Sequence, residues 1–288
     1  MKTGKFFSST GKFFTTLIFS FLFCANTLAN DTLVFGLTGT VYKGDLKVFN
    51  EWKKYLEKKI NTQVEIKFSR SYSEMISMIQ RGDVDIAYVC NTTYIKLRDQ
   101  KTAKLLAIPQ TNNQDVYYAY IIAKKGKTYN SLFDFRDKLF AYTDPGSNSG
   151  AIAATYKLLK EGIKPHFFFS KIIYTYEHSE SINAVIESFV DGASVDSLVY
   201  EQFVKRHPKK AQELQIVEKL GPFSMSPLVS NTTLDEKLHK KIQDTFVDMN
   251  KTDDGKKILE QLSLSQLKRP SNETYEDIEE MLHFLKTY

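Results

Sequence analysis

The amino-acid sequence predicts an α/β protein that is organised as two lobes. Short apolar strands alternate with amphipathic helices from residue 32 to residue 89, the same alternation starts again after Gln114, and the chain turns helical from Leu234 to its end. Two α/β units with a helical tail fit two lobes better than one continuous sheet. A chain of 288 residues, 42% apolar and 25% charged, has globular composition and is long enough for two such units.

The first unit begins with a short apolar strand and continues with two amphipathic helices. Apolar side chains recur three and four positions apart in each helix, and they alternate with polar ones in the strand between the helices. The expected order is strand, helix, strand, helix and strand, at residues 32–37, 46–60, 63–68, 72–79 and 85–89. This order at short intervals favours a parallel sheet covered by helices.

The second unit and the tail follow the same logic. Apolar runs predict strands at residues 116–123, 138–142 and 172–176. Amphipathic stripes predict helices at residues 151–159, 182–190, 234–249 and 275–285.

The first 29 residues have the order of a secretory signal peptide. Lysines come first, then the apolar run Phe13–Cys24, then small residues up to Ala29. The apolar run is shorter than the roughly 20 residues that a spanning helix needs, so an uncleaved anchor is the weaker alternative. Lipidation of Cys24 is also disfavoured, because Phe23 is bulky. We therefore expect an exported protein that starts near Asn30 and works in the periplasm.

Charge and cysteine content exclude several classes of protein. The formal net charge is +5, and three of the lysines belong to the signal, which leaves +2 on 259 residues. Such a balance gives no reason to expect a nucleic-acid partner. Cys90 is the single cysteine of the mature chain. It cannot form an internal disulfide, and its apolar surroundings predict a buried side chain rather than a reactive thiol.

The sharpest chemical signal lies at residues 143–150, TDPGSNSG, between a predicted strand and a predicted helix. A helix start offers unpaired N–H groups and the positive end of the helix dipole, which favour an anion. Ser147 and Ser149 add hydroxyl donors, and Gly150 allows a ligand to approach the backbone closely. The alternative is that one of the serines only caps the helix.

The segment FAYTDPGSNSG resembles the serine-rich anion loop of the phosphonate/phosphite/phosphate-binding proteins of ABC importers. Other segments resemble the same family in the same order. They are GDVDIAYVCNTTY (82–94), YEHSESINAV (176–185), VDGASVDSLVYE (190–201), GPFSMSPLVSNTTL (221–234) and DDGKKILEQL (253–262). The resemblance covers essentially the whole mature chain.

The resemblance implies a type II periplasmic-binding-protein fold, in which two lobes close on a small oxyanion held in the cleft between them. One lobe would comprise residues 30–116 and 226–288, and the other residues 117–225. The chain would cross between the lobes near residues 115–120 and 222–228.

The resemblance also implies the ligand-binding residues. They are Tyr42, Tyr94, Ser147, Asn148, Ser149, Gly150, His178 and, less firmly, Asp196. The two serines and the N–H groups of Asn148 and Gly150 would hold oxyanion oxygens. Tyr94 and His178 would donate further hydrogen bonds, and Tyr42 would close the pocket.

Each of these residues also has a purely structural interpretation. His178 precedes an amphipathic helix, and most of the 16 tyrosines must be packing or surface residues. Asn148 stands where the family usually carries a threonine, so a carboxamide replaces a hydroxyl. Asp196 would repel a dianion but would suit an ammonium group or a protonated oxyanion. Glu201 is a weaker candidate for the same role.

The functional prediction is a periplasmic solute-binding protein that captures phosphonate, phosphite or phosphate and delivers it to the permease of an ABC importer. It is expected to act as a monomer, without a cofactor or metal. A sensing module for a membrane receptor or kinase is the alternative, and an enzyme on the same scaffold is disfavoured because the five histidines show no metal-ligand spacing. The basic runs at Lys124–Lys127 and Lys205–Lys210 are expected to be solvated faces.

Overall fold

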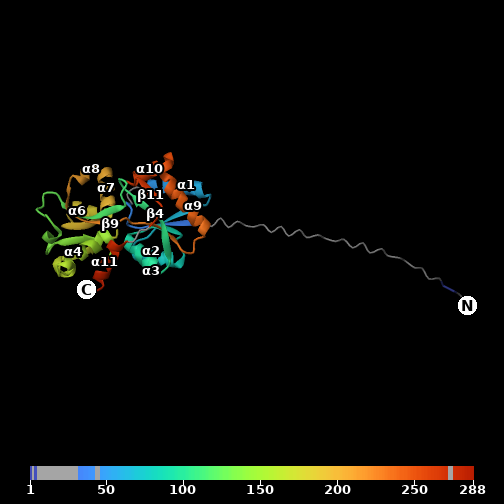
Figure 1. Cartoon of the computed structure of the whole chain (residues 1–288), viewed down its shortest axis with the longest axis horizontal. Helices are drawn as coiled ribbons and strands as arrows, with labels where there is room; N and C mark the ends of the chain where they lie inside the picture. Colours follow the sequence, from blue (N-terminus) through green and yellow to red (C-terminus); the bar gives the residue numbers. More distant parts are fainter. Residues whose placement is uncertain (2, 5–31, 43–45, 272–274) are drawn as a thin grey trace. The chain divides into compact units, whose positions relative to one another are not determined.

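The structure is a computed structural model that describes residues 1, 3–4, 32–42, 46–271 and 275–288. The predicted signal peptide therefore lies almost wholly outside the described residues. The segment from Asp31 to Tyr288 forms one compact unit. Within it, two separate sheets with their helices make the two lobes (Figure 1).

The first lobe contains a six-stranded sheet in the order β11-β4-β10-β3-β1-β2. Its strands are β1 (Leu33–Leu37), β2 (Val64–Phe68), β3 (Ile86–Tyr88), β4 (Ala103–Gln110), β10 (Leu228–Asn231) and β11 (Gln266–Lys268). Its helices are α1 (Leu46–Ile60), α2 (Tyr72–Arg81), α3 (Asn91–Asp99), α9 (Glu236–Val247) and α10 (Asp253–Gln261), with the short 3-10 turn η3 (Asp248–Lys251).

The second lobe contains a five-stranded sheet in the order β7-β6-β8-β5-β9. Its strands are β5 (Val116–Lys124), β6 (Leu139–Tyr142), β7 (Lys171–Tyr174), β8 (Gly192–Asp196) and β9 (Leu214–Ser224). Its helical elements are η1 (Leu132–Phe135), η2 (Asn148–Ile152), α4 (Ala153–Lys160), α5 (Pro165–Phe168), α6 (His178–Ile186), α7 (Ser197–Arg206) and α8 (Pro208–Ala211).

Both sheets are mixed, with antiparallel strands added to the parallel ones. The strands β1, β2 and β3 do pair in parallel, as the alternating pattern predicts. The strand β10 then returns from the second lobe and pairs antiparallel with both β3 and β4. The pairing partner of a returning strand depends on the path of the whole chain, and local apolar patterns carry no information about it.

The tail is not helical throughout, contrary to prediction. The short strand β11 interrupts it and pairs antiparallel with β4. Only three residues pair, and Leu267 is the one buried side chain among them. A strand this short leaves no alternation to detect, so the apolar periodicity of the flanking helices dominates the pattern.

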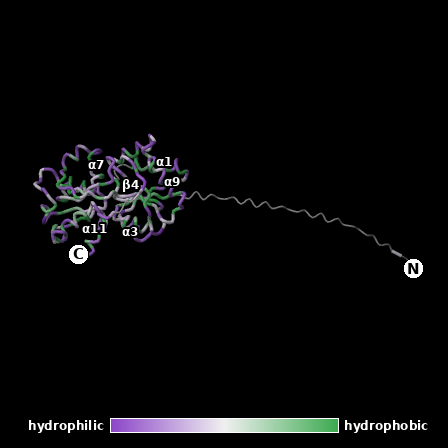
Figure 2. Tube along the Cα trace, viewed as in Figure 1, coloured by the Kyte–Doolittle hydropathy of each residue, from purple (hydrophilic) through white to green (hydrophobic). Residues whose placement is uncertain are grey.

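Separate aromatic clusters hold the two sheets to their helices. In the first lobe, the rings of Phe35 on β1 and Trp52 on α1 meet edge to face, with centroids 5.1 Å apart. In the second lobe, the ring of Phe140 on β6 stacks on that of Phe169 at 4.5 Å. Aromatic pairs at these distances stabilise a core beyond the apolar area that they bury. Hydrophilic residues cover the outer helices and loops (Figure 2).

The last helix, α11 (Glu276–Leu285), packs against both lobes. Arg98 of α3 forms an ion pair with Glu279, and Tyr156 of α4 makes an edge-to-face contact with Phe284 at 5.1 Å. Asp277 accepts hydrogen bonds from the backbone N–H and the hydroxyl of Ser224, each at 2.8 Å. The helix therefore braces the place where the chain returns from the second sheet to the first (Figure 1).

Candidate functional site

The candidate site forms where the carboxyl ends of the parallel strands of both sheets meet. Residues 38–42 follow β1 and residues 89–92 follow β3, both in the first lobe. Residues 143–150 follow β6, and Asp196 ends β8, both in the second lobe. Ligands of open α/β sheets bind outside the carboxyl ends of the strands, because helix starts and loops gather there.

The serine loop enters its helix through a π-helical turn, η2. Ser147 caps this turn, because its Oγ accepts the N–H of Gly150 at 3.0 Å. Ser147, Asn148 and Ser149 are almost completely buried. The structural interpretation of Ser147 as a cap therefore applies, but its hydroxyl hydrogen can still be donated, since a serine hydroxyl is one donor and two acceptor sites.

Gly150 has a packing role in addition to its predicted one. A Cβ at this position would lie 2.5 Å from Cβ and 2.6 Å from Oγ1 of Thr143, and 2.8 Å from Oγ of Ser147. Its N–H is already donated to Ser147. The role of this N–H as a direct oxyanion donor stays a prediction.

Asn148 has one polar atom without a partner. Its Nδ2 donates to the hydroxyl of Tyr117 at 3.0 Å, and its N–H points to Sγ of Cys90 at 3.5 Å. Its Oδ1 is buried and accepts no hydrogen bond within the described part of the chain. An orphan buried acceptor is costly, so this oxygen favours a ligand or solvent group that donates a hydrogen bond.

His178, the first residue of α6, is a neutral donor in this environment. Its Nδ1 accepts the N–H of Asp196 at 3.0 Å and lies 3.0 Å from Oγ1 of Thr143. Burial lowers the pKa of His178 to about 3. Since Nδ1 is an acceptor, the ring hydrogen sits on Nε2, which has no hydrogen-bond partner among the residues that the structure describes.

Asp196 lies beside Ser149 and starts α7. Its Oδ1 accepts the N–H groups of Leu198 and Val199, at 2.8 and 3.3 Å, while Ser149 Oγ donates to Oδ2 at 3.4 Å. Burial raises the pKa of Asp196 to about 7, although the hydrogen bonds from the start of α7 oppose that rise. Its carboxyl group is therefore partly protonated near neutral pH. Glu201 is exposed and accepts a hydrogen bond from Tyr120 at 3.2 Å.

The first lobe contributes polar residues that the sequence did not single out. Burial raises the pKa of Tyr72 and of Tyr88, and the proximity of Asp196 adds to the shift at Tyr88. The hydroxyl of Tyr72 accepts from Thr40 at 3.3 Å. That of Tyr88 has no hydrogen-bond partner among the described residues, although Tyr88 is 95% buried (5% exposed). Both tyrosines lie in ordinary apolar patterns, so no local signal marks them.

Tyr42 and Tyr94 occupy different places. Tyr42 lies at the edge of the first lobe, where its hydroxyl is 2.7 Å from Nε2 of His207 in the second lobe. Tyr94 lies on α3, and its ring centroid is 5.2 Å from that of Tyr275. Its role as a ligand contact stays a prediction.

Cys90 is buried, as predicted, but it lies at the junction of the lobes. Burial raises the pKa of its thiol, which therefore stays protonated. The thiol donates to Oδ1 of Asn91 at 3.3 Å and lies 3.5 Å from the N–H of Asn148 in the opposite lobe. The residue helps to line the junction and has no features of a nucleophile.

Two further hydrogen bonds join the serine loop to the first lobe. Asp144 accepts the N–H of Tyr72 at 3.0 Å, which places a carboxylate at the start of α2. Thr92 donates its hydroxyl hydrogen to the carbonyl oxygen of Gly146. The lobes are thus in contact around a nearly buried cluster, and a ligand would need them to separate before it could enter.

The chemistry of the cluster suits an anion without requiring a cation. Among the described residues, none of the buried polar side chains belongs to a lysine or arginine. The available groups are hydroxyls and a neutral imidazole N–H, because the N–H groups of Asn148 and Gly150 already have partners within the protein. Hydrogen bonds to a charged ligand contribute about 1.5–3 kcal/mol each, so a few of them account for micromolar affinity.

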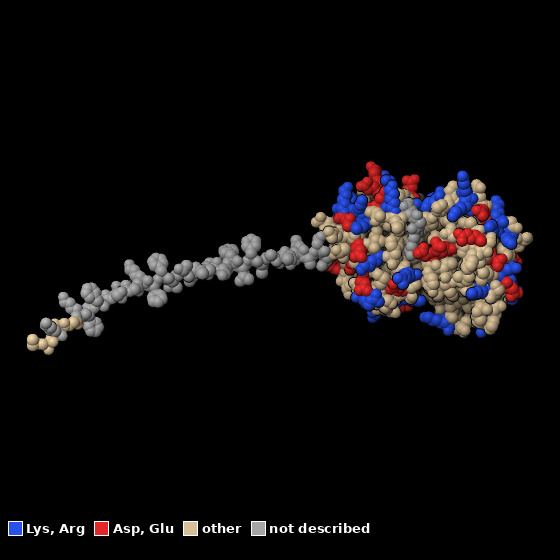
Figure 3. Space-filling model, turned by 180° about the vertical axis from the view of Figure 1, so that it is seen from behind, with Lys and Arg blue, Asp and Glu red and all other residues tan. Residues whose placement is uncertain are grey.

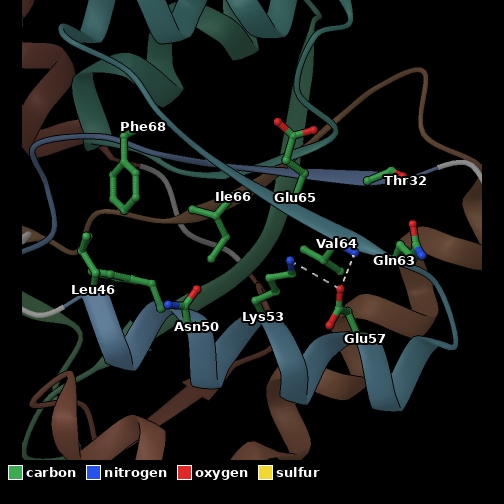
Figure 4. Close-up of a pocket in the computed structure, with 11 residues that line it drawn as sticks. Thr32, Leu46, Asn50, Lys53, Glu57, Gln63, Val64, Glu65, Ile66 and Phe68 are labelled. Atoms are coloured by element: carbon green, nitrogen blue, oxygen red, sulfur yellow. Dashed lines mark hydrogen bonds and ion pairs between the residues drawn. The ribbon is translucent and has the colours of Figure 1, made fainter.

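Other surface features lie away from this cluster. A groove of about 560 Å³ runs between α1 and β2, bordered by Leu46, Lys53 and Phe68 (Figure 4). Glu57 spans it, accepting the N–H of Val64 at 3.0 Å and facing Lys53 Nζ at 3.8 Å. Acidic and basic side chains are interspersed over the face in Figure 3. The described residues contain no cluster of potential metal ligands and no helix long and apolar enough to cross a membrane.

Comparisons with known proteins identify the family of the chain. Residues 35–275 match the family model described as "ABC transporter, phosphonate, periplasmic substrate-binding protein". The phosphonates-binding periplasmic protein of Escherichia coli strain K12 is 26% identical over 278 residues, covering 91% of this chain and 81% of that protein.

Solved structures show the same fold. A binding protein component of an ABC phosphonate transporter from Pseudomonas aeruginosa superimposes with a TM-score of 0.83 at 23% identity, covering 88% of this chain and 86% of that one. PhnD1 from Prochlorococcus marinus, in complex with methylphosphonate, gives a TM-score of 0.79 at 19% identity, covering 90% and 100%. The two-lobed type II periplasmic-binding-protein fold is thus confirmed.

The chain belongs to the family of periplasmic substrate-binding proteins of phosphonate ABC transporters. Its function is substrate binding for transport rather than catalysis, as predicted. The sensing alternative is not favoured by this membership.

Proposed function

We propose that this phosphonate-transporter binding protein holds the oxyanion head of a phosphonate, phosphite or phosphate between its lobes, with donors from the serine loop and His178. Ser147, Asn148 and Ser149 lie together at one helix start. His178, whose Nδ1 accepts the N–H of Asp196, has an Nε2–H without a partner among the described residues. The observation that carries the proposal is this concentration of buried donors where two lobes meet. Tyr88 supplies a hydroxyl from the opposite wall.

The bound species in this proposal keeps one proton. The orphan Oδ1 of Asn148 is an acceptor, and the carboxyl of Asp196 is an acceptor whenever it is ionised. A fully ionised oxyanion has only acceptors, so it would leave Oδ1 of Asn148 unsatisfied and would be repelled by Asp196 whenever that carboxyl is ionised. A phosphonate or phosphate monoanion carries one hydroxyl that can be donated, whereas the dianion carries none.

In this proposal, the protonation state of Asp196 sets the relative affinity for aminophosphonates and for phosphonates without an amino group. An ionised carboxylate repels an anion but attracts an ammonium group, so Asp196 would favour an aminophosphonate over a plain phosphonate as pH rises through about 7. Below that pH the protonated carboxyl removes the difference. The two ligand classes are therefore expected to separate with pH.

The two bodies that separate in this proposal are residues 30–116 with 226–288, and residues 117–225. A ligand that bridges them selects the closed arrangement, because only closure completes its hydrogen bonds. The closed protein would then deliver its solute to the permease of an ABC importer. We also propose that residues 1–29 are removed on export and that the mature protein is a monomer, which mass spectrometry and light scattering of the periplasmic product would test.

Calorimetric titration of the purified mature protein tests the ligand proposal. The panel comprises methylphosphonate, phosphite, phosphate and 2-aminoethylphosphonate, with sulfate as an anion that carries no proton near neutral pH. We expect binding of at least one phosphorus oxyanion at micromolar level or tighter, and none of sulfate. Sulfate binding as tight as that of the phosphorus ligands would overturn the monoprotonated assignment, and no binding by a folded protein would overturn the ligand class.

Substitution of Asn148 sharpens the same test. Asn148→Asp is nearly isosteric but puts a negative charge beside the ligand, so it should abolish anion binding. Asn148→Thr restores a hydroxyl donor in place of the carboxamide and should retain binding with a changed order of ligands. An unchanged affinity in Asn148→Asp would show that the residue does not face the ligand.

A further inference from the structure

The end of α7 meets the end of α10 across the two lobes. Gln202 Nε2 donates to the carbonyl oxygen of Leu262 at 2.7 Å, and Arg206 Nη2 donates to that of Gln261 at 3.1 Å. Lys205 Nζ donates to the hydroxyl of Ser263 at 3.1 Å. We call these contacts the α7–α10 seam. The helix α7 packs on β5, β8 and α6 of the second lobe, whereas α10 packs on α1 and η3 of the first.

The seam has a clear electrostatic basis. The last carbonyl groups of a helix have no partner within the helix and carry the negative end of its dipole. At the end of α10, Gln261 and Leu262 present such carbonyls. The side-chain amide of Gln202 and the guanidinium of Arg206, both on α7, donate hydrogen bonds to them. Gln202 is 8% exposed, so its hydrogen bond is largely shielded from water.

The seam also contacts Tyr42, one of the predicted ligand-binding residues. The guanidinium carbon of Arg206 lies 5.6 Å from the centroid of the Tyr42 ring, and the hydroxyl of Tyr42 is 2.7 Å from His207. All these contacts join residues of different lobes. None of them involves the serine loop.

We propose that Gln202 and Arg206 are positioning residues for ligand capture, which favour the closed arrangement and so raise affinity without touching the ligand. This inference rests on the proposed function, because it concerns the closure that completes the same site. The apparent affinity of a ligand for the closed form scales with the population of that form. Loss of the seam should therefore weaken every ligand by the same factor.

The basic run at the end of α7 supplies its own control. Lys209 on α8 is exposed, carries the same charge as Arg206, and makes no hydrogen bond or ion pair to the first lobe among the described residues. Arg206→Ala and Lys209→Ala each remove one positive charge. A difference between them therefore reports the seam rather than the net charge.

The first measurement compares affinities for methylphosphonate, phosphite and phosphate. The double variant Gln202→Ala with Arg206→Ala should bind each of them about tenfold more weakly, the effect of two lost hydrogen bonds. Lys209→Ala should stay within twofold of the unchanged protein. A loss that differs by more than threefold between ligands would overturn the proposal, because it would indicate contact with the ligand.

The second measurement needs no ligand. Spin labels at Lys54→Cys in α1 and Lys138→Cys before β6, both exposed positions, report the distance between the lobes, while buried Cys90 stays unlabelled. The ligand-free seam variant should populate longer distances than Lys209→Ala. Identical distance distributions would overturn the proposal. This readout stands even if no phosphorus oxyanion binds, so failure of the seam and failure of the proposed ligand are distinguishable. Arg206→Ala alone serves if the double variant does not fold.

Discussion

The two walls of the candidate cleft hold their polar groups in different ways. The wall of the second lobe consists of helix starts, where Ser147, Ser149, His178 and Asp196 are connected to one another by hydrogen bonds and backbone caps. The wall of the first lobe consists of side-chain hydroxyls and Cys90. Thr38, Thr40 and Tyr72 are linked by hydrogen bonds, whereas the hydroxyl of Tyr88 has no partner in the described residues.

This difference suggests a division of roles. A wall whose donors are fixed by neighbouring groups is already arranged for an anion before one arrives, which lowers the cost of binding. A wall of side-chain hydroxyls makes fewer directed contacts and acts more as a cover. We therefore expect substitutions in the second lobe to affect affinity more than matched substitutions in the first.

The largest expected difference is between two glycines. Gly150→Ala places a Cβ against the body of Thr143 on the second wall, whereas Gly36→Ala on β1 meets chiefly the flexible end of Met75 at 2.7–2.8 Å. Gly150→Ala should weaken phosphonate binding roughly 100-fold, or about 3 kcal/mol, because the loop must shift. Gly36→Ala should lower stability but leave affinity nearly unchanged. Calorimetry measures the affinity of each variant, and urea unfolding measures its stability. An equal loss of affinity in the two variants would contradict the proposed difference between the walls.

Loss of one hydroxyl comes next. Ser149→Ala should weaken binding by about 1–3 kcal/mol, the effect of one lost hydrogen bond to a buried charge. Ser181→Ala is the matched control, because its buried hydroxyl bonds to Thr175 at 2.7 Å, behind the second wall. It should change stability only. An unchanged affinity in Ser149→Ala would return this serine to a purely structural role.

The pH dependence of stability separates two neighbours on the second wall. His178, with a folded pKa of about 3 against 6.5, binds a proton more readily when unfolded, so its contribution to stability is lost as pH falls from about 6.5 toward 3. Asp196, with a folded pKa of about 7 against 3.8, binds a proton more readily when folded. Its contribution is present at lower pH and is lost as pH rises from about 4 to 7.

Between about pH 4 and 6.5, the contributions of His178 and Asp196 to the free energy of unfolding change with pH in opposite directions. Replacing one residue should therefore reveal the pH dependence that the other residue causes. Asp196→Asn should make stability rise with pH in this window, and His178→Gln should make it fall, each by roughly 1–2 kcal/mol. Thermal unfolding across the range measures both. Slopes of the same sign in the two variants would show that one of these residues is not shifted as described.

The smallest expected effect comes from the first wall. Tyr88→Phe should weaken phosphonate binding by about 0.5–1.5 kcal/mol, because it removes one hydroxyl near Asp196. Tyr94→Phe tests the remaining prediction for α3 under the same conditions. An effect of Tyr94→Phe larger than that of Tyr88→Phe would place the ligand nearer to α3, and an effect of Tyr88→Phe larger than that of Ser149→Ala would reverse the comparison of the walls.

Much of the second wall could be predicted because its signals are local. A serine-rich segment between a strand and a helix start needs only the chain order to indicate an anion site. His178 and Asp196 are indicated by the family resemblance, and both begin helices in the structure. The first wall has no such signal. Tyr72 and Tyr88 lie in apolar patterns that any packed helix or strand would show. They become part of the candidate site only because the two lobes pack against each other there.

The sequence by itself determined the α/β class, the burial of Cys90, the near neutrality of the predicted mature chain and the place of the serine loop. These follow from periodicity, composition and the chemistry of helix starts, all of which act within a few residues. The antiparallel return of β10, the short strand β11, the first wall and the α7–α10 seam were decided by tertiary structure. They bring together residues that are far apart in the chain: Ser230 lies beside Ile86, 144 positions earlier, and Lys268 lies beside Ile108, 160 positions earlier, in the first sheet. No local pattern encodes such a pairing, because its energy arises only when distant segments share one surface.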